Sequence, residues 1–344
     1  MATRFTSFGP GRVNLIGEHT DYNQGLALPF AIEAGVTVRA SALRDLRIEA
    51  IAADLDERDA FDLKRVDRAE GWRGFVRGAA AELARFGAEL VGADLEISGT
   101  VPRGAGLSSS AALEVALVLA LLALAGAGEP DRMELARLCS RIENDWVGAQ
   151  TGLLDQIASL FGEPDRALRI DFRSLEVRPV TLSLGDFLLV TVDSGEQHTH
   201  AGSGYNERRA ECVEACKLLG VDSLRDAELF DVESLPAPLD ARVRHVVTEN
   251  ARVDEAVAAL ASGEMVQLGR LLDASHASLR DDYEISTPAV EETVARCKRA
   301  GALGARIMGG GFGGSVLALM PPGSRQLDGA VTVRPGPGAA VSGS

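Results

Sequence analysis

Apolar residues recur at helical spacing in several segments of the chain. In residues 74–86 they fall every three or four positions, with Phe75 and Leu83 on one stripe, which is the pattern of an amphipathic helix. Residues 133–147 repeat this pattern and present Glu143 beside the apolar face. In the second half of the chain, the same spacing predicts helices over residues 206–219, 240–262, 265–279 and 288–300.

Short runs of alternating or continuous apolar residues predict strands at residues 13–16, 35–42, 46–52, 94–101, 187–192 and 315–320. Helices and strands are mixed without a repeated βαβ order, which favours an α+β fold. A chain of 344 residues exceeds the usual size of one domain, so we expect two domains, residues 1–179 and 180–344. The Gly- and Pro-rich tail, residues 334–344, predicts a loose coil.

The most apolar run of the chain, residues 115–128, lies between Glu114 and Glu129. It is shorter than the roughly 20 residues that a membrane-spanning helix needs, so it predicts a buried core helix and no membrane segment. The N-terminus has no basic region followed by an apolar stretch, and therefore no secretory signal. The 4 cysteines lack the spacing of a zinc site or a disulfide framework. These features predict a cytoplasmic protein.

Hydrophobic residues make up 46% of the chain and charged residues 25%, which is ordinary for a folded protein. The formal net charge of −15 argues against a nucleic-acid partner, because binding to phosphates needs clustered Lys and Arg. An anionic nucleotide would also be repelled by this charge. Any ATP site must therefore be locally positive.

A glycine- and serine-rich loop, VPRGAGLSSSAA at residues 101–112, follows a predicted strand and opens the apolar helix. Glycines let the backbone approach phosphate oxygens, and the helix N-terminus supplies unpaired N–H groups and the positive end of the helix dipole. The serines would equally serve as helix caps. The loop lacks the Gly-Lys-Ser/Thr of a Walker A motif, so an ordinary P-loop NTPase is excluded. Alone, the loop leaves a phosphate cradle and a helix cap both open.

A second polar segment, GPGRVNLIGEHTDYN at residues 9–23, places an arginine, two carboxylates, a histidine and two amides between glycines. Carboxylates are natural acceptors for neighbouring hydroxyl groups, so a sugar or polyol is a plausible ligand. Arg12 is suited to a phosphate. The alternative is a polar loop that is stabilised by its own Asx turns.

Together with GGGFGG at residues 309–314, these segments form three motifs in the order found in the galactokinases, a family of the GHMP kinases, and the chain resembles that family from Gly11 to about Gly338. Further similar stretches are GLLDQ at 152–156, YNERR at 205–209 and SLRDDYE at 278–284. The resemblance implies a ribosomal protein S5 domain 2-like N-terminal domain, a ferredoxin-like C-terminal domain and an active site in the cleft between them. It also implies transfer of the γ-phosphoryl group of MgATP to the C1 hydroxyl of D-galactose.

The resemblance also implies roles for individual residues. Asp155 matches the catalytic aspartate, and Arg12 matches the arginine that contacts this aspartate and the phosphoryl group. Ser110 and Glu143 match the Mg²⁺ partners. The positions that match the sugar site are Arg12, Glu18, His19, Asp21, Gly152, Asp155 and Tyr205. Those that match the ATP site are Trp72, Gly104, Ala105, Gly106, Leu107, Ser108, Ser109 and Ser110.

Each of these roles has a structural alternative. Asp155 is placed to be a helix N-cap, Glu143 to be a solvated helix carboxylate, and His19 to be a structural hydrogen-bonding group. Trp72 suits the core as well as adenine. We expect a monomer.

The sequence departs from the family pattern mainly at residues 192–198, VDSGEQH, where relatives are rich in Asn. This segment leads toward Tyr205, so it leaves open a kinase for another sugar, such as N-acetylgalactosamine or arabinose. Leu153 and Leu154 replace the Ile-Met of the family, and Ser315 stands where many relatives carry Cys. A non-catalytic sugar sensor is the remaining alternative, but such sensors have an altered serine–alanine loop, whereas residues 108–112 are complete here.

Overall fold

The computed structural model describes residues 4–101, 106–196 and 201–343. Its first half is built on a six-stranded sheet with the order β13-β1-β3-β6-β4-β5. These strands are β1 (Arg4–Asn14), β3 (Pro29–Ala42), β4 (Arg47–Ala52), β5 (Glu57–Asp62), β6 (Ala93–Gly99) and β13 (Ala340–Gly343). Only the β4–β6 pair is parallel among the described strand pairs of this sheet.

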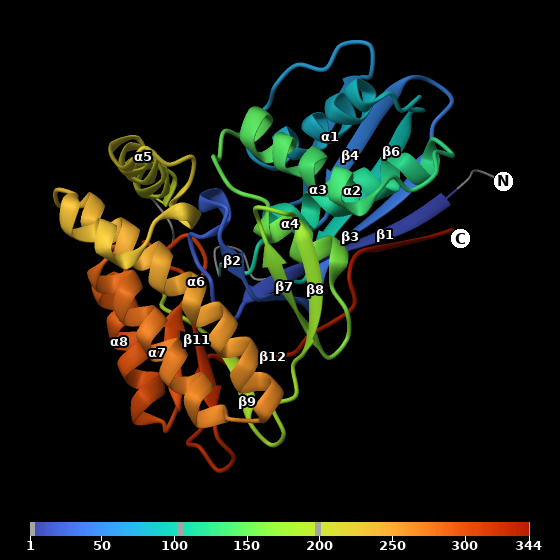
Figure 1. Ribbon diagram of the computed structural model, residues 1–344. Helices are drawn as coiled ribbons and strands as arrows, with labels where there is room; N and C mark the ends of the chain where they lie inside the picture. The colour runs from blue at the N-terminus through green and yellow to red at the C-terminus, as the bar shows by residue number, and fades with distance from the viewer. Residues whose placement is uncertain (1–3, 102–105, 197–200, 344) are drawn as a thin grey trace.

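Four helices pack on one another and on this sheet (Figure 1): α1 (Trp72–Phe86), α2 (Ser109–Leu124), α3 (Arg132–Arg141) and α4 (Leu154–Phe161). Helix α2 contacts the strands β1 and β3, and its remaining faces contact helices α1, α3 and α4. A helix that is surrounded in this way must be apolar on all its faces, which explains the continuous apolar run predicted for it. Its residues 115–122 are all buried.

A small sheet of order β2-β7-β8 lies beside the larger one. It consists of β2 (Leu26–Ala27), β7 (Arg166–Asp171) and β8 (Glu176–Thr181). A short 3₁₀ helix, η1 (Asp21–Asn23), precedes β2 and belongs to the polar segment of residues 9–23. The small sheet therefore holds the end of that segment in place.

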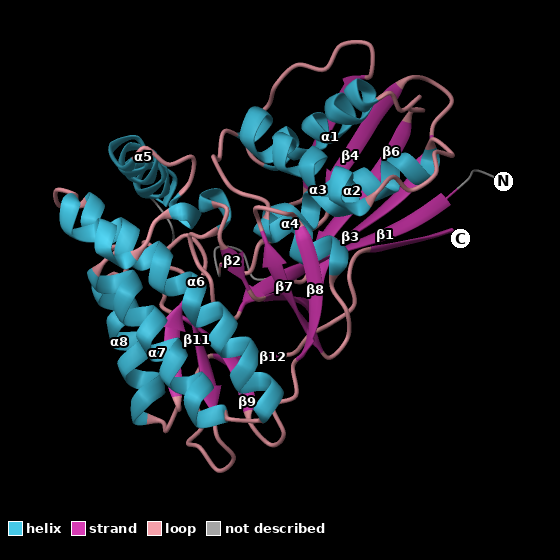
Figure 2. Cartoon of the chain, in the orientation of Figure 1, coloured by secondary structure: helices cyan, strands magenta, loops and turns pink. Residues whose placement is uncertain are grey.

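The second half has a four-stranded antiparallel sheet of order β10-β11-β9-β12, with helices packed against it (Figure 2). The strands are β9 (Leu188–Asp193), β10 (Gly304–Ile307), β11 (Ser315–Met320) and β12 (Ala330–Val333). The helices are α5 (Ala201–Leu219), α6 (Leu239–Ser262), α7 (Met265–Asp281) and α8 (Pro288–Arg299), with two short 3₁₀ helices, η3 (Leu224–Asp226) and η4 (Leu229–Ser234).

The two halves share a hydrophobic core. One buried cluster contains Val13 and Leu28 from the first half together with Leu268 and Leu317 from the second. The chain also returns to its starting sheet, because β13 pairs antiparallel with β1. The domain division between residues 179 and 180 stays a prediction. Strand β13 comes after this division in the sequence but pairs with the sheet of the first half.

Most predicted elements are present, and the exceptions have physical causes. Helix α2 spans Ser109–Leu124, whereas the predicted core helix extends to residue 128. The helix ends earlier because Gly126, Gly128 and Pro130, which disfavour helix, follow Leu124. The predicted helix at 133–147 changes at Ile142 into a π-helical turn, Ile142–Val147. The prediction of a loose coil for residues 334–344 was wrong, since β13 lies within that range.

Several elements were not predicted, among them β2, β5, β7, β8, β12 and α4. Strand β5 reads ERDAFD, and only Phe61 in it is buried, so it lacks an apolar pattern and depends on its pairing with β4. The mixed α+β class is confirmed. Within the described ranges, none of the helices has the length and apolar character needed to cross a membrane.

Candidate active site

A cavity of about 370 Å³ lies where the two halves meet. Its wall combines the polar segment 9–23, the glycine–serine loop, the start of α4 and residues of α5 and the 309–314 glycine run. It gathers thirteen of the site residues that the sequence predicts: Arg12, Glu18, His19, Asp21, Gly106, Leu107, Ser108, Ser109, Ser110, Glu143, Gly152, Asp155 and Tyr205. Two other predicted residues, Gly104 and Ala105, lie outside the described residues.

Arg12 and Asp155 form a two-pronged ion pair in this wall. Arg12 Nε donates to Asp155 Oδ1 at 2.7 Å and Nη2 donates to Oδ2 at 2.9 Å, while Nη1 donates to the carbonyl oxygen of Gly106 at 2.5 Å. Burial lowers the pKa of Arg12, but the charges of Asp155 and Glu18 outweigh burial and raise it. Arg12 therefore stays a cation, and the pair fixes the direction of the Asp155 carboxylate.

The backbone near Arg12 is shaped for this contact. The β1–β3 register shifts between Pro10 and Arg12, and such irregularities often re-aim a side chain beside an active site. The Arg12 amide donates to Leu107 O at 3.0 Å, and a Cβ at Gly11 would lie 2.6 Å from the same oxygen. Glycine at position 11 thus lets β1 approach the loop. The N-cap of α4 is Leu153, so Asp155 is not the helix cap that the sequence left open.

The described part of the glycine–serine loop leads directly into α2. Ser108 occupies the N-cap position with φ 59°, yet its side chain makes no capping hydrogen bond. Its hydroxyl oxygen is buried and has no partner among the described residues. The N-terminus of α2 and an unsatisfied hydroxyl thus face the cavity, which favours an anion site over a simple cap.

Glu143 lies on the π-helical turn that follows α3, a kind of irregularity that is frequent at functional sites. It is 6% exposed, so it is not the solvated carboxylate that the sequence left open. Its Oε2 accepts hydrogen bonds from Thr151 Oγ1 at 2.7 Å and Gln156 Nε2 at 2.9 Å. Burial, followed by the charge of Asp155, raises the pKa of Glu143, and a hydrogen bond with Ser110 opposes that shift. A cation bound here would relieve the cost of burying this carboxylate.

Asp21 and Gly152 lie against each other on another part of the wall. A Cβ at Gly152 would collide with the Asp21 carboxylate, so this approach requires glycine. Burial, followed by the charge of Asp155, raises the pKa of Asp21 to about 6. Two carboxylates, Asp21 and Asp155, therefore share one cavity.

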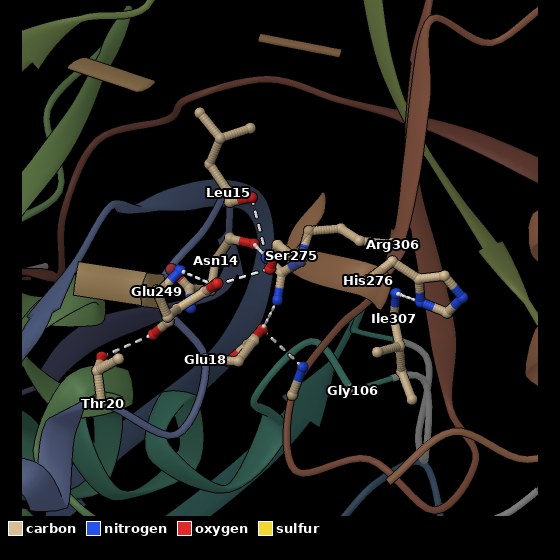
Figure 3. A network of polar contacts seen from close by, with 12 residues as sticks. Asn14, Leu15, Glu18, Thr20, Gly106, Glu249, Ser275, His276, Arg306 and Ile307 are labelled. Carbon is tan, nitrogen blue, oxygen red and sulfur yellow. Dashed lines mark hydrogen bonds and ion pairs between the residues drawn. The ribbon is translucent and has the colours of Figure 1, made fainter. Parts of the chain in front are cut away.

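Glu18 connects the polar segment to the second half of the chain (Figure 3). Its Oε1 accepts a hydrogen bond from the amide of Gly309 at 2.8 Å and lies 2.9 Å from Arg306 Nη2. Arg306 is completely buried, and its Nη1 donates to the carbonyl oxygens of Asn14 and Leu15, both at 2.9 Å. The glycine run and the polar segment are thus joined through one buried ion pair.

A second buried carboxylate, Glu249 of α6, supports the same segment. Its Oε1 accepts from the amide of Gly17 at 2.9 Å and from Ser275 Oγ at 2.7 Å (Figure 3). Sequence reasoning missed both Arg306 and Glu249. The signal for Arg306 was a charged residue in the short strand GARI, which is separated by one residue from the glycine run. Glu249 offered only a carboxylate on the buried side of a long helix, which is a weak signal.

Trp72 does not belong to the cavity wall. Its Nε1 donates to Glu57 Oε2 at 2.8 Å, the guanidinium of Arg73 lies 5.1 Å from its ring centre, and the ring packs against the first-half core. These contacts agree with the core alternative. A role for Trp72 near adenine stays a prediction.

Comparison with known proteins agrees with this geometry. The family described as GHMP kinases N terminal domain matches residues 74–163, and GHMP kinases C terminal matches residues 256–328. The galactokinase galactose-binding signature matches residues 2–42. The galactokinase of Mycobacterium tuberculosis is 46% identical over 339 residues, covering 95% of this chain and 92% of its own. That of Streptomyces coelicolor is 44% identical over 323 residues, covering 90% and 83%.

Among solved structures, Lactococcus lactis galactokinase in complex with galactose matches with a TM-score of 0.91 and 34% identity, over 98% of this chain and 95% of that one. Methanococcus jannaschii mevalonate kinase matches with a TM-score of 0.70 and 18% identity, over 96% and 98%, which shows a shared fold alone. The chain therefore has the GHMP kinase fold that the sequence predicted. Within the GHMP kinases, it belongs to the galactokinase family.

Proposed function

We propose that this protein transfers the γ-phosphoryl group of ATP to the C1 hydroxyl of D-galactose and forms galactose 1-phosphate and ADP. The observation that carries the proposal is the two-pronged Arg12–Asp155 pair, which lies in the cavity wall beside the N-terminus of α2. This arrangement puts a carboxylate and a phosphate-binding helix end within one cavity. Phosphoryl transfer needs mainly such positioning and charge stabilisation.

In this proposal, the glycine–serine loop and the start of α2 bind the phosphates of ATP. Residues 106–110 line the cavity, and the hydroxyl group of Ser108 has no partner in the described part of the chain. Arg12 stays charged and stabilises the phosphoryl group during transfer. The local positive character that the acidic chain needs comes from Arg12 and the helix end together.

Ser110 and Glu143 would hold Mg²⁺, which neutralises charge on the ATP phosphates when it is bound. The two side chains fit this role because they interact at the cavity wall and Glu143 is a buried carboxylate without a buried arginine or lysine partner among its described hydrogen bonds. No cluster of three or more His, Cys, Asp or Glu that could bind a metal occurs in the described ranges. Mg²⁺ commonly uses few protein ligands together with phosphates and water, so such a cluster is not required.

Asp155 would orient the sugar hydroxyl or accept its proton. Glu18, His19, Asp21, Gly152 and Tyr205 line the same cavity and would bind the other hydroxyl groups. The protein is expected to be a monomer and to act in the cytoplasm.

A substrate panel tests the proposal. ADP release is measured with MgATP and galactose, N-acetylgalactosamine, arabinose or glucose, and kcat/KM is compared. The expected result is a clear preference for galactose. A higher kcat/KM for another sugar would make the protein a kinase for that sugar. Binding of galactose and ATP without any ADP release would make it a sensor.

A further inference from the structure

The chain contains only 3 tyrosines, and all of them surround His19. The ring centres of Tyr22, Tyr205 and Tyr283 lie 5.9, 5.1 and 4.8 Å from that of His19. His19 itself has φ 59°, a left-handed backbone conformation that is uncommon outside glycine. Tyr205 lines the cavity, whereas Tyr22 and Tyr283 do not. The function proposed above gives no role to these two residues.

A continuous chain of hydrogen bonds runs from His19 away from the cavity. His19 Nδ1 lies 2.7 Å from Tyr22 Oη, Tyr22 Oη lies 3.1 Å from Tyr283 Oη, and Tyr283 Oη lies 3.0 Å from Cys212 Sγ. These hydrogen bonds link η1 with the residues after α7 and with α5, so they join the two halves of the protein. Tyr283 and Cys212 are 0% and 2% exposed.

The other ring nitrogen of His19 points to a ligand. Nε2 is buried and makes no hydrogen bond of good geometry within the described ranges, although the carbonyl of Gly310 lies near the ring and His19 lines the cavity. Burial, followed by the charge of His245, lowers the pKa of His19 to about 3, while the carbonyl of Gly310 acts in the opposite sense. The ring is therefore neutral near pH 7 and carries one hydrogen, on either Nδ1 or Nε2.

The partners of Cys212 favour one position for the ring hydrogen of His19. Asn23 Nδ2 donates to the carbonyl oxygen of His19 at 2.8 Å, which fixes the amide orientation, and the same group donates to Cys212 Sγ at 3.6 Å. The sulfur is thus already an acceptor. The thiol hydrogen of Cys212 has an acceptor in this series of hydrogen bonds if it points at Tyr283 Oη. Each hydroxyl then donates to the next group, and the last donates to His19 Nδ1.

We propose that Tyr22, Tyr283 and Cys212 are positioning residues that hold His19 in the tautomer with hydrogen on Nε2, so that His19 acts as a hydrogen-bond donor to an oxygen of the sugar. Only the predicted effect on sugar binding rests on the function proposed above. Its structural part, the tautomer of one histidine, is measured without turnover. A failure of either part can therefore be told apart from a failure of the other.

The tautomer is measured by ¹⁵N NMR of the full chain labelled at histidine. The chain has 5 histidines, and His19→Gln identifies the His19 signals by their absence. The expected spectrum of the wild-type protein shows a protonated Nε2 and an unprotonated Nδ1 at His19. Tyr22→Phe removes the donor to Nδ1, so a mixture of tautomers is expected. A wild-type His19 with hydrogen on Nδ1 overturns the proposal.

Kinetics test whether the tautomer serves sugar binding. Tyr22→Phe is expected to raise KM for galactose about fivefold, the effect of one hydrogen bond of ~1 kcal/mol. Tyr283→Phe leaves the Tyr22 hydroxyl in place and should raise this KM about twofold, with a smaller change in Cys212→Ala. In all three variants, kcat and KM for ATP should stay within about twofold of the wild type.

Cys297→Ala is the matched control, because Cys297 and Cys212 are buried thiols of the same hydrophobic cluster. It should change the melting temperature as much as Cys212→Ala does and leave KM for galactose unchanged. A Tyr22→Phe protein that melts at a lower temperature but keeps the wild-type KM and the Nε2 tautomer would show a purely structural role and would overturn the proposal.

Discussion

The two sides of the cavity are held in different ways. The phosphate side consists of Arg12, Ser110, Glu143 and Asp155, and its described contacts run within the first half of the chain. The sugar side consists of Glu18, His19, Asp21, Gly152 and Tyr205. Two of its first-half members contact the second half: Glu18 contacts Arg306 (Figure 3), and His19 contacts Tyr205 and Tyr283.

This difference predicts different consequences of mutation. The phosphate side is a set of charged groups whose partners are close in space and belong to one half, so its variants should lose rate while the fold remains. The sugar side lies at the junction of the halves, so variants that break its contacts with the second half should lose sugar affinity and stability together. Each prediction below tests one side of this comparison.

Asp155→Asn should give the largest loss. The amide keeps the size of the carboxylate but accepts no proton and leaves Arg12 without its counter-charge. We expect kcat to fall by at least about 10³-fold, within the range of general acid–base catalysis. ATP binding, measured by titration calorimetry, should stay close to that of the wild type. Turnover within tenfold of the wild type would remove Asp155 from the mechanism.

Arg306→Met tests the junction. It leaves the buried Glu18 carboxylate without its cation, which typically costs about 3–5 kcal/mol in the free energy of unfolding. Chemical denaturation measures this loss, and KM for galactose should rise in parallel. Arg39→Met is the control, since its ion pair with Glu96 is exposed and should contribute less than about 1 kcal/mol. Equal losses in the two variants would contradict the role given to Arg306.

Glu143→Gln tests the proposed metal partner. Loss of the carboxylate should raise the Mg²⁺ concentration required for half-maximal activity by about 10- to 100-fold, as is typical when a metal site loses a supporting group. Glu134→Gln, at an exposed position of α3, is the matched control and should show no shift. An unchanged Mg²⁺ requirement in Glu143→Gln would place the metal elsewhere.

Arg12→Lys should lower kcat by about tenfold. Lysine keeps the positive charge but loses the planar fork that holds both oxygens of Asp155. Steady-state kinetics at saturating ATP and galactose measure the change. If kcat is unchanged, Arg12 only packs against Asp155 and takes no part in the transfer.

Asp21→Asn should change the stability of the protein in a way that depends on pH. The pKa of Asp21 is raised to about 6 in the folded protein, above the ordinary value of 3.8. Its contribution to stability is therefore fully present below about pH 4 and is lost as pH rises through about 6. Asn cannot ionise, so the stability of the variant relative to the wild type should rise by about 3 kcal/mol between pH 4 and 7. A difference that does not change with pH would mean that Asp21 ionises normally.

Much of the phosphate side could be predicted from the sequence, because its motifs are continuous segments. The glycine–serine loop, Arg12 and Asp155 each lie in a short run of characteristic composition. The turn that presents Glu143 could not be predicted as π-helical, since the apolar spacing of residues 133–147 fits a regular helix. The helix start at Ser109 was also hidden, because serines are equally common just outside a helix.

The sugar side was predicted less completely, because its support comes from distant residues. Tyr283 follows Tyr22 by 261 positions and Arg306 follows Asn14 by 292. The pattern of apolar and polar residues in a short segment does not indicate contacts between residues so far apart in the sequence. The same reason explains β13, whose exposed residues pair with β1 through the backbone and carry no apolar signal of their own. In the first half, Trp72 packs against the core, and its role near adenine stays a prediction.

The measurement that tests the central claim most directly is NMR of the product formed from galactose and MgATP. The account predicts one sugar product, galactose phosphorylated at C1, formed in equal amount with ADP and absent when Asp155→Asn replaces the wild type. Phosphate on another carbon, or ADP formed equally fast without galactose, would contradict the assignment of this cavity as a galactose 1-kinase site.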